Sequence, residues 1–241
     1  MTAARAAALA AAAAIGLASA NAGSSASTLP GPAPQLRRDA FANAAAVARN
    51  AACIACHVEE ASEWRTSRHA ASFENGAFQR ALAREAPSMQ PFCRGCHAPE
   101  ADPASVPSAA LRHVGVGCVT CHEPLGPVVS APRPGASPNA PHAVVRDPAF
   151  ATTAACGRCH EFRLPSFGFQ RTVTEHAGSG DARACADCHM PREGARKSHA
   201  FPGGYDEPRV RGAASITASR RGGDVRVRIA PRDVGHAFPT G

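Results

Sequence analysis

All ten cysteines of the chain occur in one pattern, Cys-x-x-Cys-His, which is repeated five times. The motifs are Cys53/Cys56/His57, Cys93/Cys96/His97, Cys118/Cys121/His122, Cys156/Cys159/His160 and Cys185/Cys188/His189. This pattern is the signature of covalent c-type haem attachment. Residues three and four apart share one face of a helical turn, so two thiols can bond the vinyl groups of one porphyrin while the next imidazole binds its iron. The sequence therefore predicts five covalently bound haem c groups.

Other roles for the cysteines fit the pattern less well. An isolated Cys-x-x-Cys pair could be a redox dithiol or half of a zinc site, and ten cysteines could form a disulfide framework. None of these roles explains why a histidine follows the second cysteine of every motif. Five identical matches are far more specific than one, so the repeat favours haem.

The first 22 residues have the features of a secretory signal peptide. Arg5 supplies a positive charge, residues 6–17 form an apolar stretch, and small residues at 18–22 offer a cleavage site. The apolar stretch is too short for a membrane span, which needs about 20 residues. We therefore expect a periplasmic or otherwise exported protein with no membrane span in its mature chain.

Composition divides the rest of the chain into three parts. Residues 23–38 are small, polar and proline-containing, which predicts a disordered leader. We expect a pentahaem domain over 39–205, and the start of a β-rich extension, truncated at its end, over 206–241. Short helices are predicted at 39–56, 59–71, 78–85, 150–159 and 181–189, with a long proline-rich loop at 123–141.

The predicted fold class is mainly α with long loops, wrapped around five haems, with a β-hairpin extension at the C-terminus. The hairpin is predicted because apolar and polar residues alternate over 215–219 and 224–229, on either side of Arg221-Gly222-Gly223. Aromatic residues make up 5% of the chain, so the porphyrins would supply much of the buried apolar surface.

The formal net charge of +7 is not taken to indicate a nucleic-acid partner. Basic patches often mark nucleic-acid binding, but the propionate groups of five haems would offset this charge. We expect redox proteins as partners.

Six histidines lie outside the motifs. They are His69, His113, His142, His176, His199 and His236. A haem with two imidazole ligands is closed and carries electrons, whereas one with a single protein ligand can bind a substrate. Six candidates for five positions would allow every iron a second histidine. Met89 and Met190 are less favoured ligands, because imidazoles are abundant in this chain.

Three segments outside the bare repeat carry a resemblance to a known family. Residues 64–70 read W-R-T-S-R-H-A, residues 115–124 read G-V-G-C-V-T-C-H-E-P, and residues 185–191 read C-A-D-C-H-M-P, followed by H-A-F at 199–201. Over about residues 52–204 the chain thereby resembles the cytochrome c-554/c-prime family of multihaem cytochromes. The resemblance implies short helices around stacked haem pairs, with His69, His142 and His199 as distal ligands.

The resemblance implies one further distal ligand and leaves the last one open. Residues 234–241 are similar to a G-H-x-x-P-T-G element of larger relatives, which implies that His236 is also a ligand. The family's best-known members carry four haems, so the fifth has no template. His176 stands where relatives usually have tryptophan, and His113 lies five residues before Cys118. Either of the two could fill the remaining distal position.

These features favour an electron-transfer protein that acts between redox partners. The alternative is a reductase of a nitrogen or sulfur oxyanion, or of NO, at one five-coordinate haem. A third hypothesis is a sensor or structural subunit. The sequence predicts no catalytic residue, and it leaves open whether the protein is an enzyme.

Overall fold

The computed structural model describes residues 42–123, 127–133, 141–163 and 169–238. The predicted signal peptide, the leader and parts of the predicted loop at 123–141 lie outside the described residues. Within the described ranges, no helix is long and apolar enough to cross a membrane.

The described chain is mostly helical, with strands only in small pairs. The helices are α1 (Ala42–Cys56), α2 (Val58–Thr66), α3 (Gly76–Leu82), α4 (Gln90–His97), α5 (Ala109–Val114), α6 (Cys118–His122), the 3-10 helix η1 (Pro148–Ala151), α7 (Ala154–His160), α8 (Thr172–Ser179), α9 (Cys185–His189) and α10 (Glu207–Ala213). The strands are β1 (Val128–Ser130), β2 (Val144–Arg146), β3 (Glu161–Arg163), β4 (Phe169–Arg171), β5 (Arg192–Glu193), β6 (Arg196–Lys197), β7 (Ala214–Arg221) and β8 (Asp224–Pro231).

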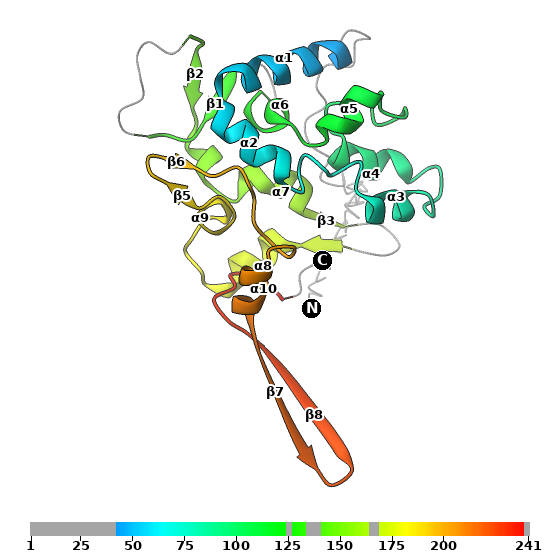
Figure 1. Ribbon diagram of the computed structural model, residues 1–241, viewed down its shortest axis with the longest axis vertical. Coiled ribbons are helices and arrows are strands. Elements are labelled where there is room, and N and C mark those ends of the chain that lie inside the picture. The colour runs from blue at the N-terminus through cyan, green and yellow to red at the C-terminus, as the bar shows by residue number, and fades with distance from the viewer. Residues whose placement is uncertain (1–41, 124–126, 134–140, 164–168, 239–241) are drawn as a thin grey trace, which may run out of the picture.

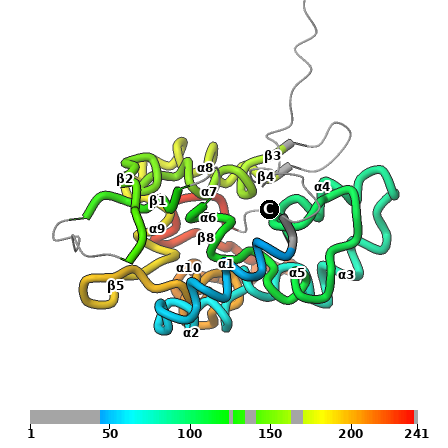
Figure 2. Tube along the Cα trace, turned by 90° about the horizontal axis from the view of Figure 1, so that it is seen from above, coloured from blue at the N-terminus to red at the C-terminus, as the bar shows by residue number. Residues whose placement is uncertain are grey.

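The short helices, several of which carry the Cys-x-x-Cys-His motifs, do not form layers. Figures 1 and 2 show α3 and α4 on one side of the body and β1, β2 and α9 on the other, with α1 beside α6. Strands β1 and β2 pair in parallel, and the other three pairs are antiparallel. The body thus consists of short helices joined by long connections.

Local capping explains several element boundaries. Asn75 accepts hydrogen bonds from two backbone N–H groups at the start of α3, and Ser108 accepts one at the start of α5. Helix α2 ends at Thr66, five residues before its predicted end, because Ser67 adopts an extended conformation and its hydroxyl accepts from the Ala70 N–H at 3.3 Å.

The structure differs from the sequence-based helix predictions at several other places. The helix predicted over 150–159 is split into η1 and α7, and that predicted over 181–189 begins only at Cys185. Strand β1 lies inside the region predicted to be a loop. Helices α5, α8 and α10 were not predicted, because six to eight residues are too few to establish a helical period.

The apolar core of the described residues is small. Its buried members are Ala46, Phe73, Leu82, Ala98, Ala101 and Leu111, with Val47, Phe78 and Cys93 packed against them. Half of the buried members are alanines, which bury little surface each. The side chains of the body therefore provide only limited hydrophobic stabilisation of their own.

A buried polar cluster joins α1 to α6. Asn50 donates to the Glu100 carboxylate, and its own Oδ1 accepts from the Cys118 backbone N–H at 2.8 Å. Glu100 accepts from the Thr120 backbone N–H at 3.1 Å and from its hydroxyl at 2.8 Å. Gly117 has no side chain to cap α6, so Asn50 and Glu100 bind the first N–H groups of that helix instead.

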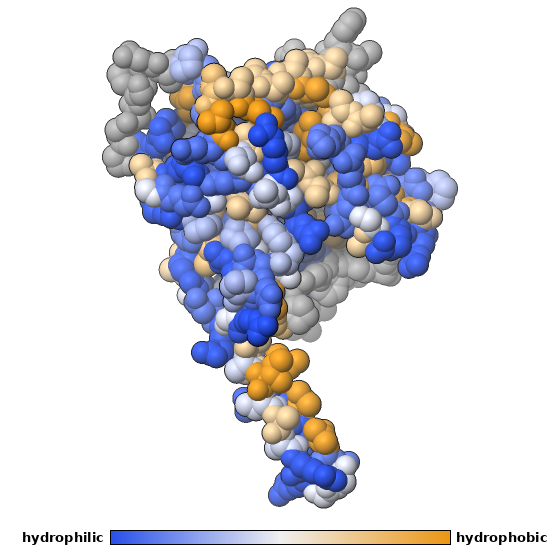
Figure 3. All heavy atoms as spheres, in the orientation of Figure 1, coloured by the Kyte–Doolittle hydropathy of each residue, from blue (hydrophilic) through white to orange (hydrophobic). Residues whose placement is uncertain are grey.

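Strands β7 and β8 form a hairpin that extends away from the body (Figure 1). Ile216 pairs with Ile229 and Ala218 with Val227, so these apolar side chains share one face. Figure 3 shows apolar residues gathered along the hairpin, and Ile216 and Val227 are 70% and 57% exposed. The hairpin thus presents an uncovered apolar face.

The position of Gly117 yields a stability prediction. A Cβ atom there would lie 2.5 Å from Asn50 Oδ1 and 2.7 Å from Glu100 Oε1, so Gly117→Ala must push apart the buried cluster. We expect the haem-loaded variant to lose about 1–3 kcal/mol of unfolding free energy, measured by urea titration. Gly178→Ala on α8 is the control, because a Cβ at Gly178 meets nothing within 4 Å. Equal urea midpoints for the two variants would contradict the proposed packing.

Candidate haem-binding sites

Each Cys-x-x-Cys-His motif lies at the end of a short helix. The motifs are on α1, α4, α6, α7 and α9, and each of these helices ends at the second cysteine or at the motif histidine. One helical turn therefore brings the two thiols and the imidazole of a motif to neighbouring positions. All ten cysteines fall within the described residues, and none of them forms a disulfide there.

Thiols from different motifs lie against one another. Cys118 of the third motif donates a hydrogen bond to Cys53 of the first, which lowers the pKa of Cys53 to about 7. Cys156 of the fourth motif does the same for Cys185 of the fifth, and lowers the pKa of Cys185 to about 6. The attachment points of separate motifs are therefore adjacent.

The second cysteines of the motifs have less uniform surroundings. They are Cys56, Cys96, Cys121, Cys159 and Cys188, of which the first and third are exposed and the others half-buried. Although part of Cys121 is open to solvent, desolvation by the surrounding protein raises the pKa of its thiol, and repulsion from Cys159 adds to this effect. The third and fourth motifs are therefore also neighbours, through Cys121 and Cys159.

Cys188, the second cysteine of the fifth motif, lies on α9 within electrostatic reach of Arg183. Together with the stronger contacts to Asp181 and Asp233, it raises the pKa of the Arg183 guanidinium. That Cys159 and Cys188 each bond a porphyrin stays a prediction from the sequence.

Four motif histidines each face a histidine from outside the motifs. The ring centroids are 6.3 Å apart for His57 and His142, 6.2 Å for His160 and His69, 6.2 Å for His122 and His199, and 6.2 Å for His189 and His236. Two metal–imidazole bonds of about 2 Å each, plus the distance from nitrogen to ring centre on both sides, span about 6 Å. Each gap therefore fits one metal ion held between two imidazoles.

Carbonyl oxygens orient several of these rings. Nδ1 of His122 lies 2.8 Å from the Val129 carbonyl oxygen, and Nδ1 of His189 lies 2.8 Å from that of Pro202. His97, His199 and His236 make the same kind of contact at 2.9, 3.0 and 2.9 Å. A carbonyl oxygen only accepts, so Nδ1 carries the proton and Nε2 keeps its lone pair. Proteins commonly orient metal-binding histidines in this way.

Burial keeps several of the imidazoles uncharged. It lowers the pKa of His69 to about 4, assisted by repulsion from His160 and His189. Burial also lowers the pKa of His122 and of His199. The neutral ring is the form that binds a metal, so these side chains are ready to do so at neutral pH.

The remaining motif histidine, His97 of the second motif, has a different environment. Its ring stacks on Phe78, with centroids 3.7 Å apart and an angle of 8° between the ring planes. Beside it lies a cavity of about 210 Å³ that Phe92, Phe162 and Met89 help to line. Among the ring contacts of the described residues, none places a second histidine against His97.

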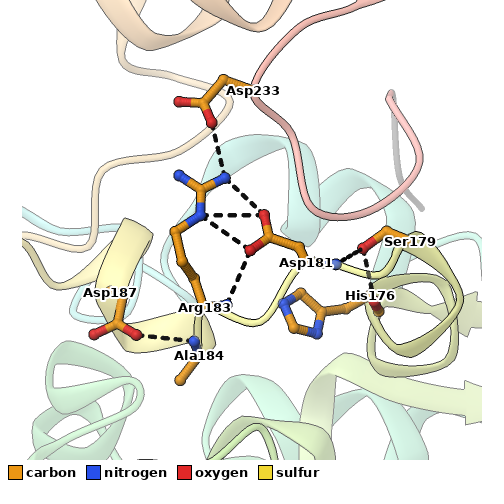
Figure 4. A network of polar contacts seen from close by, with 7 residues as sticks. All are labelled: His176, Ser179, Asp181, Arg183, Ala184, Asp187 and Asp233. Carbon is orange, nitrogen blue, oxygen red and sulfur yellow. Dashed lines mark hydrogen bonds and ion pairs between the residues drawn. The ribbon is translucent and has the colours of Figure 1, made fainter.

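The two open candidates for the last distal ligand lie elsewhere. The His113 side chain is 86% exposed, and its Nδ1 is 3.3 Å from Glu74. His176 lies on α8, close to Asp181 (Figure 4) and within electrostatic reach of Cys185 of the fifth motif. Among the described residues, neither ring is in contact with the ring of a motif histidine.

The segments that carry the family resemblance meet in space. The Trp64 indole N–H donates to the Val116 carbonyl at 2.8 Å, and the Val116 N–H donates to the His69 carbonyl at 3.0 Å. Gly115 has a φ of +58°, and a Cβ there would lie 2.5 Å from the Ala70 carbonyl oxygen. Only glycine suits this close approach. The loop that carries His69 is thus tied to the segment that precedes the third motif.

Ion pairs hold the segment of His199 in a comparable way. The carboxylate of Glu63 on α2 accepts from the His199 backbone N–H at 2.8 Å and pairs with Arg196 at 2.7 Å. These contacts, the one with Arg196 above all, lower the pKa of Glu63 to about 2, so the carboxylate is charged at neutral pH. Helix α2 therefore supports two histidine-bearing segments, through Trp64 and through Glu63.

Sequence reasoning missed Asn50, Glu100, Glu63 and Arg196. In the sequence, these residues stand in an alanine-rich helix, a proline-containing stretch and charged segments, where a solvent-exposed position is the usual expectation. The only sequence signal for Asn50 is a polar residue one helical turn before Cys53, on the same face of α1.

The contact of Trp64 yields a second prediction. Trp64→Phe keeps an aromatic ring but leaves the Val116 carbonyl without its donor, so we expect the holoprotein to lose about 1–2 kcal/mol in urea unfolding. Thr66→Ala is the matched control on the same helix, because the bond from Thr66 to the Glu63 carbonyl is exposed. Its loss should cost about 0.5 kcal/mol or less. A Trp64→Phe variant as stable as the control would refute the importance of this link.

Comparisons with known proteins find one matching family model and one similar solved structure. Residues 52–123 match the family model for cytochrome c554 and c-prime. The fold resembles the crystal structure of a penta-haem cytochrome c552 from Thermochromatium tepidum, with a TM-score of 0.61 and 22% sequence identity. The match covers 78% of this chain and 66% of that structure, so the chain spans less than two thirds of its length. The sequence matches no curated protein.

Proposed function

We propose that this chain, whose matches support a multihaem c-type cytochrome family, is an exported electron-transfer protein that attaches one haem c at each of its five motifs. One observation carries the proposal. Each of four motif histidines faces a second histidine, with 6.2–6.3 Å between the ring centroids. Each such pair would leave an iron no free position for substrate, which is typical of electron carriers.

The paired rings define the axial ligands of the proposal. The motif histidines His57, His97, His122, His160 and His189 are the proximal ligands. The distal ligands are His142 for His57, His199 for His122, His69 for His160, and His236 for His189. Haem c bound there would supply a reversible one-electron ferric/ferrous couple.

The residues of the chain have separate tasks in this proposal. The cysteines, Cys159 and Cys188 included, bind the porphyrins covalently. The adjacent first thiols of different motifs, as with Cys53 and Cys118, keep the attachment points close together. Carbonyl contacts hold the imidazoles in the tautomer that binds iron. These tasks belong to residues 39–205, with His236 contributed by the proposed β-rich extension at 206–241.

Location and partners form a further part of the proposal. The predicted signal peptide and the covalent attachment of haem support the periplasm or another exported location. Soluble or membrane-bound redox proteins would exchange electrons with the chain.

A second function is favoured by one observation only, at His97. Reduction of NO, or of a nitrogen or sulfur oxyanion, needs an open coordination position on an iron. His97 faces no second histidine among the described residues, and Met89 lines the cavity beside it. A thioether ligand from Met89 would close that iron, whereas a vacant position would allow a small ligand to bind.

The proposal predicts both the haem count and the spin states. The purified protein should contain five haems per chain by pyridine haemochrome assay and by intact mass. Replacement of His69, His142, His199 or His236 by alanine should each convert one haem from low-spin to high-spin in electron paramagnetic resonance, because each removes one axial ligand.

His113→Ala and His176→Ala are the matched controls, and both should leave the spectrum unchanged. A high-spin signal from either control would move the distal assignment to that residue. Fewer than five haems would overturn the proposal for the motif left empty. Binding of NO or CO by the unaltered protein would show that one iron has an open position. If Met89 is not a ligand, Met89→Ala should leave the amount of bound NO or CO unchanged.

A further inference from the structure

The segment that follows the hairpin, residues 233–238, lies against the fifth motif. It carries His236, whose ring centroid lies 6.2 Å from that of His189, with an angle of 14° between the two ring planes. The segment follows β8 directly, and the base of the hairpin is closed by a hydrogen bond from the Arg232 N–H to the Ala213 carbonyl at 2.7 Å. The position of His236 therefore depends on contacts that hold this segment to the body.

Arg183 makes one of these contacts from the loop before α9. Its Nη2 lies 2.8 Å from Asp233 Oδ1 and 2.6 Å from Asp181 Oδ2, so one guanidinium bridges two carboxylates (Figure 4). Nε of Arg183 adds contacts of 3.0 and 3.1 Å to the two oxygens of Asp181. A planar guanidinium suits this two-point binding better than an ammonium group does.

Asp181 is itself fixed in place. Its side chain accepts from the Arg183 backbone N–H at 2.9 Å, and its own backbone N–H donates to the Ser179 hydroxyl at 3.1 Å. Ser179 in turn donates to the His176 carbonyl at 2.7 Å, at the end of α8 (Figure 4). Arg183 is therefore held from the body side before it reaches Asp233.

The backbone of the segment passes directly over this ion pair. A Cβ on Gly235 would lie 2.9 Å from Asp181 Oδ2, so the chain approaches the carboxylate as closely as only glycine allows. Asp233 has a φ of +47°, a region that residues other than glycine seldom occupy. Such a conformation persists where surrounding contacts hold it, and here Arg183 supplies one. The Ala237 N–H adds a bond of 3.3 Å to Glu175.

We propose that Arg183, anchored by Asp181, is a positioning residue that clasps Asp233 and thereby keeps His236 against the ring of His189. The inference rests on the proposed function, because it takes His236 as the distal ligand of the fifth haem. Without the contact between Arg183 and Asp233, the His236 imidazole would dissociate from the iron more easily, and the oxidation state of the iron would not change. The position of the hairpin would thus influence the coordination of this haem.

The test compares three variants of the haem-loaded protein. Arg183→Ala should raise the fraction of one high-spin haem roughly fivefold, since surface charge networks contribute modestly, and CO binding to the reduced protein should rise with it. Arg183→Lys should restore only part of the low-spin signal, because an ammonium group lacks the second nitrogen that, as Nε of Arg183, also binds Asp181. Arg211→Ala is the matched control, an arginine whose ion pair with Glu207 lies within α10, and it should change nothing.

His236→Ala separates this inference from the ligand assignment. If His236→Ala gives a high-spin haem but Arg183→Ala does not, the clasp is wrong and the assignment stands. If His236→Ala leaves all haems low-spin, both are overturned. Should Arg183→Ala fail to fold, Asp233→Asn removes the charge at the other end of the bridge, and an unchanged spectrum for that variant refutes the clasp.

Discussion

The rest of this structure depends on four gaps, each wide enough for one metal ion between two imidazoles. The rings that face each other come from distant parts of the chain, as with His57 and His142 or His69 and His160. A small, alanine-rich core cannot by itself hold such segments together. Bound metal would therefore serve as cross-links between them, and the protein would gain its stability together with its cofactors.

Because the apolar core is small, polar contacts help to hold the paired histidines at their distances. Asn50 and Glu100 fix the helix of the third motif, and Trp64 fixes the loop of His69. The residues that give the chain its family resemblance are thus in contact with one another through Val116. These residues therefore join helix α2 and the loop of His69 to the segment before the third motif, a structural role in addition to the attachment of haem.

The sequence was sufficient to predict the motifs and their helical setting, because these depend on residues three and four apart. It could not pair His160 with His69, since that pairing depends on how distant loops approach each other. It also gave no reason to expect Glu100 to be buried, as a carboxylate between proline-containing segments is normally exposed. The ligand set inferred from the resemblance stays a prediction, to which the paired rings lend support.

The contacts between thiols of different motifs have a consequence for how the protein can be made. Cys53 next to Cys118, and Cys156 next to Cys185, are pairs of neighbouring thiols, and disulfides form and persist in oxidising compartments. Such a bond would consume one attachment point of each of two motifs at once. In the exported location proposed for the chain, haem attachment would compete with this oxidation, and the thiols would have to stay reduced until haem is attached.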